Sequence, residues 1–135
     1  MFIGAPQGPP GEGTLARILI VEDAPFIVES FTEIINDQNW QVSGVAKTGL
    51  EAIELYKKDK PDVVIMDILL PGLDGLTAIK KIREMDPTAK ILVVSALAKK
   101  DLDKECLKAG AKAFIKKPFD TKTFVTTLKA IIEGK

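Results

Sequence analysis

Five short apolar runs alternate with amphipathic segments along this chain, and that alternation limits the folds it can adopt. Three of the runs, ILIV, VVIM and ILVV, are continuous and rich in β-branched residues, which is typical of strands buried on both faces. The weaker runs QVSGVA and AKAFI suit the edges of a sheet. Strands that alternate with helices through short connections predict an α/β fold, in which helices cover both faces of a parallel sheet.

The segments between the apolar runs carry signals of helix ends. Pro25 suits a first helical turn, residues 48–51 (TGLE) have the spacing of a capping box, and Asp74 can cap a third helix. Gly110 is typical of the residue that ends a helix. We expect Tyr56 to lie at the surface of the second helix.

The length of 135 residues fits a single domain. Residues 1–14 are rich in glycine and proline. Such a stretch buries too little apolar surface to offset its ordering entropy, so we expect a flexible N-terminal arm there. Residues 15–135 are expected to form the folded domain.

Composition and charge argue against several classes of protein. Nineteen basic residues balance nineteen acidic ones, which gives no general attraction to nucleic acid or to acidic membranes. No run is long enough to span a membrane, and the N-terminus lacks the pattern of a signal peptide, so we expect a cytoplasmic protein. The chain has no histidine, which removes the commonest general base and metal ligand among side chains. The single cysteine, Cys106, is expected to pack inside the fold.

Five polar residues stand where the apolar runs end. They are Glu22 and Asp23, Asp67, Ser95 and Lys117. The carboxyl ends of parallel strands meet along one edge of a sheet, so these distant residues are expected to share one pocket.

Three neighbouring carboxylates, on Glu22, Asp23 and Asp67, would repel one another. Two unit charges about 5 Å apart cost about 3 kcal/mol at an effective dielectric of about 20. A bound Mg²⁺ ion would offset this repulsion, because it prefers hard oxygen ligands and retains coordinated waters that a phosphate oxygen can replace. Mn²⁺ could take its place, and Lys117 would add a further positive charge.

Asp67 is the strongest candidate for a nucleophile. It follows a buried strand directly and precedes a loop with proline and glycine, so its carboxylate is expected at the sheet edge, within reach of solvent. A carboxylate in such a place can attack phosphorus and form an aspartyl-phosphate. The Ser95 hydroxyl, the Lys117 ammonium and the metal ion would neutralise the phosphoryl oxygens.

Each of these residues taken alone has an ordinary structural explanation. The acidic pair could be a solvated turn, Asp67 a turn former, Ser95 a helix cap and Lys117 a surface charge. Their agreement in type and position favours the functional reading.

The motifs ED, MDILLPGLDG, VVSALA and KKPF, in this order, closely resemble the receiver domain of two-component response regulators, in particular the single-domain chemotaxis type. The resemblance covers about residues 17–133. It implies a flavodoxin-like fold with five parallel strands in the order 2-1-3-4-5, two helices on one face and three on the other.

The resemblance also implies a role for each site residue. Asp67 would be phosphorylated, with Asp23, Asp67 and the backbone carbonyl of Leu69 as Mg²⁺ ligands and Glu22 as their acidic neighbour. Ser95 and Lys117 would bind the phosphoryl oxygens, and the Lys117–Pro118 bond would be cis. Phe114 falls on the position of the aromatic residue that changes conformation in this family.

The implied partners are a sensor histidine kinase or histidine phosphotransfer protein and a downstream output protein. The output protein would dock on the face made by the fourth helix, fifth strand and fifth helix, around Lys100, Asp103, Leu107 and Phe114. The chain would be a monomer or a phosphorylation-dependent dimer. It would catalyse only its own phosphorylation and dephosphorylation.

The chain departs from the commonest family pattern at two positions. Leu69 and Leu97 stand where polar residues often help to position hydrolytic water. We therefore expect slow autodephosphorylation.

Two other classes of protein share parts of the pattern. A phosphatase of the haloacid dehalogenase type uses a strand-end aspartate and Mg²⁺, but it normally needs a second aspartate where Leu69 stands. A flavodoxin-like cofactor binder needs a first loop that cradles phosphate, whereas the acidic loop at residues 22–25 would repel it.

Overall fold

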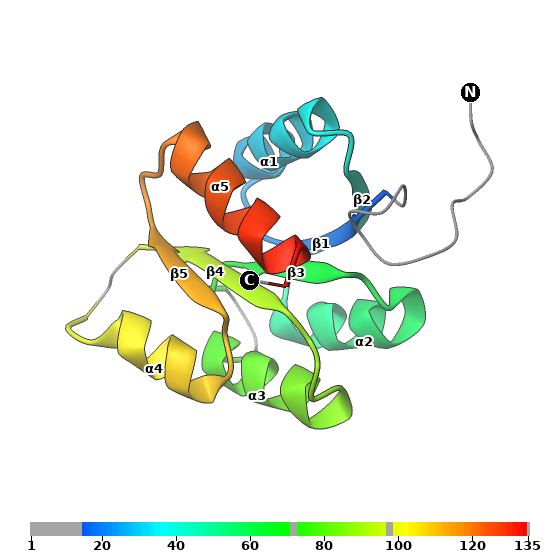
Figure 1. Ribbon diagram of the computed structural model, residues 1–135. Helices are drawn as coiled ribbons and strands as arrows, with labels where there is room; N and C mark the ends of the chain where they lie inside the picture. Colours follow the sequence, from blue (N-terminus) through cyan, green and yellow to red (C-terminus); the bar gives the residue numbers. More distant parts are fainter. Residues whose placement is uncertain (1–14, 71–72, 97–98, 135) are drawn as a thin grey trace.

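The computed structural model describes residues 15–70, 73–96 and 99–134. In these ranges strands and helices alternate and form three layers, with the sheet between two layers of helices (Figure 1). The strands are β1 (Arg17–Val21), β2 (Gln41–Ala46), β3 (Val63–Met66), β4 (Ile91–Ser95) and β5 (Ala113–Lys116). The helices are α1 (Pro25–Asp37), α2 (Gly49–Asp59), α3 (Gly75–Met85), α4 (Leu102–Ala109) and α5 (Thr121–Ile132).

The sheet is parallel throughout and its strand order is β2-β1-β3-β4-β5, as predicted. The two weaker runs form the edge strands β2 and β5. Val21 pairs with Met66 at the ends of β1 and β3, and Ser95 pairs with Lys116 at the ends of β4 and β5. This register brings the strand ends level with one another at the carboxyl edge.

Alternate residues of the central strands supply the cores on the two faces of the sheet. On one face, Val64 and Met66 of β3 pack with residues of α2, α3 and α4. On the other face, Ile65 packs with α1 and α5, where the rings of Phe31 and Phe124 stack with centroids 5.1 Å apart. Among the described helices, two therefore cover one face and three the other (Figure 1), as predicted.

The predicted helix signals are present at the helix ends. Pro25 opens α1, and Asp74 caps α3 by accepting the Leu76 N–H. The Thr48 hydroxyl accepts the Glu51 N–H at the start of α2, while the Glu51 carboxylate accepts the N–H of Lys47. The predicted stop at residue 110 is also present, where glycine adopts a φ of +125°.

Gly75 allows α3 to begin close to the carboxyl edge of the sheet. A Cβ atom at Gly75 would lie 2.5 Å from the Cα of Ile68, which directly follows Asp67. A side chain there would force the backbone apart, so glycine allows the start of α3 to pack against the loop after β3.

The expectation for Tyr56 was wrong, and that for Cys106 is confirmed. Tyr56 is only 6% exposed because its ring packs into the core between α2 and α3, where its hydroxyl donates to Asp86 at 2.7 Å. Cys106 is fully buried, and burial raises the pKa of its thiol to about 11. No helix in the described ranges is long and apolar enough to cross a membrane.

Candidate functional site

The candidate site is built on backbone bonds that extend the sheet by one residue beyond three strands. The N–H of Glu22 donates to Ala46 at 2.9 Å, and that of Asp67 donates to Val21 at 3.0 Å. The N–H of Lys117 donates to the carbonyl of Ser95, also at 3.0 Å. The side chains after β1, β3 and β5 are therefore held in fixed positions along one edge.

The Asp67 carboxylate lies at the centre of the site. Its Oδ1 accepts the Ser95 hydroxyl at 2.7 Å and the Leu69 backbone N–H at 2.9 Å. Its Oδ2 accepts the Lys117 ammonium at 3.0 Å. The side chain is held at the sheet edge rather than in the apolar core, although only 9% of the residue is exposed. The predicted meeting of Asp67, Ser95 and Lys117 is present in the structure.

Lys117 lies between two carboxylates. Its Nζ is 2.9 Å from Glu22 Oε1 and 3.0 Å from Asp67 Oδ2. Burial by itself would lower the pKa of this ammonium, but hydrogen bonds and coulombic attraction to Glu22 and Asp67 outweigh it, so the pKa is raised. Lys117 is therefore a cation at neutral pH. The peptide bond between Lys117 and Pro118 is cis, as expected from the resemblance.

The two adjacent acids, Glu22 and Asp23, have opposite surroundings. Glu22 is 2% exposed, and its second oxygen accepts the N–H of Ala24 at 3.1 Å. Asp23 is exposed, and its carboxylate takes part in no hydrogen bond or ion pair within the described part of the chain. One acid is thus neutralised inside the site, and the other carries an uncompensated charge at its mouth.

The repulsion anticipated among three carboxylates is reduced by Lys117, whose ammonium lies between Glu22 and Asp67 and compensates one of their two charges. Correspondingly, no group of three or more acidic, histidine or cysteine side chains in the described ranges is arranged to hold a metal ion. The donor set still fits Mg²⁺, which takes one or two carboxylates and fills its other positions with water and carbonyl oxygens. Asp23 offers a carboxylate that has no ion-pair partner in the described residues. It directly follows Glu22, which shares the Lys117 ammonium with Asp67.

Phe114 and Ser95 lie near each other on neighbouring strands. Phe114 of β5 pairs with Val93, two residues before Ser95 on β4. Ser95 is completely buried, whereas Phe114 is half-buried against the core under α2, α3 and α4. A pocket of about 350 Å³ runs along β5 and the start of α5, and Phe114 and Phe119 line it.

The remaining residues of the predicted output face lie on or beside α4. Lys100 precedes this helix and is exposed, Asp103 is half-buried in its first turn, and Leu107 is exposed. Leu97, which together with Leu69 is expected to slow autodephosphorylation, lies outside the described residues, and so do residues 1–14. These positions therefore remain sequence predictions.

Sequence reasoning missed one exposed apolar side chain near the site. Phe26, three residues after Asp23, is 71% exposed in the first turn of α1. Leu69, two residues after Asp67, is 50% exposed. The available signal was that Phe26 falls off the apolar stripe made by Ile27 and Phe31, so that it must face solvent.

Comparisons with known proteins agree with this architecture. A family model described as the response regulator receiver domain matches residues 18–129. Chemotaxis protein CheY of Thermotoga maritima is 45% identical over 115 residues, which cover 85% of this chain and 96% of that protein. Chemotaxis protein CheY of Treponema pallidum is 36% identical over 130 residues, which cover 95% of this chain and 90% of that protein.

The comparison with solved structures gives the same result. The crystal structure of a CheX–CheY–BeF₃–Mg²⁺ complex from Borrelia burgdorferi matches with a TM-score of 0.85 and 34% identity, covering 95% of this chain and 98% of that chain. The response regulator domain of Thermotoga maritima CheB matches with a TM-score of 0.81 and 32% identity, covering 90% of this chain and 98% of that chain.

Proposed function

This chain belongs to the response regulator receiver family, the phosphoryl-accepting signalling domains of two-component systems, and on that premise we propose that Asp67 is its phosphorylated residue. The observation that carries the proposal is the convergence of a hydroxyl, an ammonium and a backbone N–H on the Asp67 carboxylate. The comparisons give no support to a phosphatase of the haloacid dehalogenase type. The proposed receiver spans residues 15–135.

In the proposed reaction, a carboxylate oxygen of Asp67 attacks the phosphorus atom of a partner's phosphohistidine. A P–O bond to Asp67 forms, the P–N bond breaks, and the imidazole leaves with the bonding electron pair and takes up a proton. The Lys117 ammonium and the Ser95 hydroxyl already touch the two oxygens of Asp67, so a phosphoryl group there would lie within their reach. They would then neutralise part of its charge of about −1.5 to −2.

Receiver domains of this type bind Mg²⁺, and the related structure from Borrelia burgdorferi contains it. We propose that Asp23, Asp67 and the Leu69 carbonyl hold the ion here, with Glu22 as their acidic neighbour, and that Mn²⁺ can replace it. The ion would supply a hard positive charge to the phosphoryl oxygens. The unpaired charge of Asp23 supports this assignment.

Signalling is proposed to follow from the movement of Ser95. The serine would exchange its bond to Asp67 Oδ1 for one to a phosphoryl oxygen. The space it leaves would let the half-buried Phe114 turn inward on β5. Phosphorylation shifts such a two-state equilibrium only by its different interaction with the two states, and the Ser95 and Lys117 bonds supply that difference.

Two separate surfaces are proposed for partners. A sensor histidine kinase or histidine phosphotransfer protein would approach the carboxyl edge, where Phe26 and Leu69, which follow the acids closely in the sequence, are exposed. An output protein would bind the α4–β5–α5 face around Lys100, Leu107 and Phe114.

Phosphohistidine is made from ATP inside the cell, so we also propose a cytoplasmic location. The proposed state is a monomer or a phosphorylation-dependent dimer.

Phosphorylation by a small donor tests the assignment of Asp67. Purified protein is incubated with phosphoramidate and Mg²⁺, and the acid-labile phosphoryl group is measured by intact mass. Asp67→Asn is expected to abolish uptake, while Asp37→Asn at the end of α1 leaves it unchanged. Full uptake by Asp67→Asn would remove this residue from its proposed role, and steady turnover of p-nitrophenyl phosphate by the unmodified chain would instead indicate a phosphatase.

A further inference from the structure

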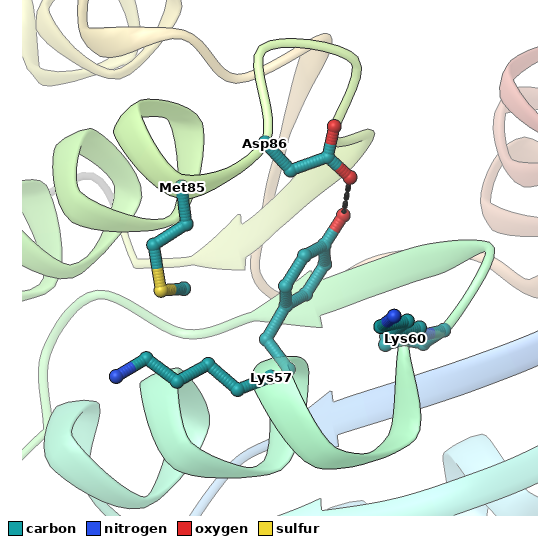
Figure 2. Close-up of a pocket in the computed structure, with 6 residues that line it drawn as sticks. Lys57, Lys60, Met85 and Asp86 are labelled. Atoms are coloured by element: carbon teal, nitrogen blue, oxygen red, sulfur yellow. Dashed lines mark hydrogen bonds between the residues drawn. The ribbon is translucent and has the colours of Figure 1, made fainter.

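A second pocket lies near the amino-terminal ends of the strands, whereas Asp67 lies at their carboxyl ends. It has a volume of about 430 Å³ and opens between the ends of α2 and α3 (Figure 2). Its lining residues are Tyr56, Lys57, Lys60, Pro61, Met85 and Asp86. Because β3 begins after this pocket and ends just before Asp67, the length of the strand separates the two places. We call this pocket the α2–α3 groove.

The floor of the α2–α3 groove is apolar and held in place. The Tyr56 hydroxyl donates to Asp86 at 2.7 Å, which fixes the ring between the two helix ends. Figure 2 shows the Met85 side chain reaching from α3 towards α2, and Met85 is 38% exposed. Pro61 completes this surface. An apolar side chain could rest here without displacing any residue of the core.

The rim of the groove carries positive charge. Lys57 and Lys60 are both exposed, and their ammonium groups take part in no ion pair within the described residues. Asp86 is the one carboxylate in the lining, and Tyr56 and Thr88 already donate to its oxygens. Two cations therefore remain without partners beside an apolar floor.

The electronegative end of α2 does not cancel this positive charge. The Arg17 guanidinium donates to the last backbone carbonyls of the helix. Its Nη1 lies 2.6 Å from the carbonyl oxygen of Asp59 and 3.2 Å from that of Lys60. A cation at a helix C-terminus compensates the helix dipole. Arg17 therefore leaves Lys57 and Lys60 free to attract an external anion.

We propose that the α2–α3 groove binds an acidic peptide segment of a partner protein, with one apolar side chain on the Tyr56–Met85 floor and carboxylates at Lys57 and Lys60. A peptide suits the groove because both lysines and Met85 stay exposed to solvent, whereas small ligands are largely enclosed. The site is independent of Asp67 and would allow the chain to be held by one protein while it exchanges phosphoryl groups with another.

The test uses a blocked hexapeptide with a central leucine–phenylalanine pair flanked by glutamates. It is titrated to about 1 mM into ¹⁵N-labelled protein, and amide shifts are followed. Saturable shifts at residues 56–61 and 85–86 are expected, and the same peptide with lysines in place of glutamates should give none there. The double variant Lys57→Glu, Lys60→Glu should weaken binding by about tenfold or more.

The matched control is the double variant Lys122→Glu, Lys129→Glu on α5, which changes net charge equally on the other face of the sheet. It is expected to bind the acidic peptide nearly as well as the unmodified protein does. Equal weakening by both double variants would mean attraction to net charge alone and would overturn the proposal. Absence of saturable shifts at the groove would overturn it as well.

Discussion

Lys117 and Glu22, which stand 95 positions apart in the chain, form an ion pair of 2.9 Å beside the Asp67 carboxylate. Glu22 is almost completely buried, so its charge depends on this one ammonium for compensation. The same ammonium binds Asp67 at 3.0 Å. A single lysine thus joins the ends of β1, β3 and β5, and its loss has consequences for stability as well as for chemistry.

Lys117→Met is expected to destabilise the fold. It leaves Glu22 and Asp67 without their cation, and an uncompensated buried charge is costly. Because the Lys117 side chain is partly exposed, the free energy of unfolding should fall by about 3 kcal/mol, the low end for a broken buried ion pair. Urea denaturation measures the change. Lys116→Met, at the exposed neighbouring position, is the control and should change stability by less than about 0.5 kcal/mol. Equal losses in the two variants would contradict the role of the buried pair.

Stability should decline at alkaline pH. The pKa of Lys117 is raised in the fold, so its contribution is fully present below the unfolded value of 10.5 and is lost as pH rises through the folded value. Urea denaturation above about pH 10 should therefore show a steep loss in the unmodified protein and a shallower one in Lys117→Met. A parallel decline in both proteins would contradict this prediction.

Tyr56, the one tyrosine of the chain, should not ionise near its usual pKa. Burial, and then the hydrogen bond to Asp86, raise the pKa of the phenol well above 10.0, so native protein should gain phenolate absorbance only when alkali unfolds it. An absorbance titration followed together with circular dichroism checks this coincidence. Phenolate that appears while the fold is intact would contradict the buried position of Tyr56.

Asp23→Asn is expected to weaken Mg²⁺ binding by tenfold or more, about 1.4 kcal/mol. This change removes the carboxylate at the site that has no cation beside it, whereas Asp67 keeps its bond to Lys117. Isothermal titration calorimetry measures the affinity, and Asp37→Asn at the end of α1 serves as the control. Unchanged affinity in Asp23→Asn would place the metal ion elsewhere.

Leu69→Asn should shorten the lifetime of the phosphorylated protein. The Leu69 side chain lies two residues after Asp67 and is half exposed, so an apolar group stands where an amide could position water for hydrolysis. Decay of the phosphorylated mass measures the lifetime. Leu50→Asn, an equally polar change at an exposed leucine of α2, should leave it unchanged. The same prediction holds for Leu97→Glu, and unchanged lifetimes in both variants would contradict it.

Local patterns determined most of the fold in advance. Continuous β-branched runs are typical of strands buried on both faces and formed the interior of the sheet, and the weaker QVSGVA and AKAFI runs formed its edges. Capping residues such as Thr48 and Asp74 act within one turn of their own helix, so their effect can be predicted from adjacent residues in the sequence. Because parallel strands end at a common edge, the meeting of Asp67, Ser95 and Lys117 followed from the strand assignments.

The tertiary structure alone decided which of two adjacent acids faces inward. Successive side chains point to opposite sides of an extended segment, and the bond from the Glu22 N–H to Ala46 sets which side each takes. Glu22 therefore meets Lys117 while Asp23 stays in solvent. Tyr56 is similar, since it lies with Ala52 on the side of α2 that is buried in the core shared with α3. The sequence by itself determined the elements and the chemistry at their ends, because these depend on neighbours in the chain. Side-chain direction depends on register and on packing between distant elements, which only the folded chain supplies.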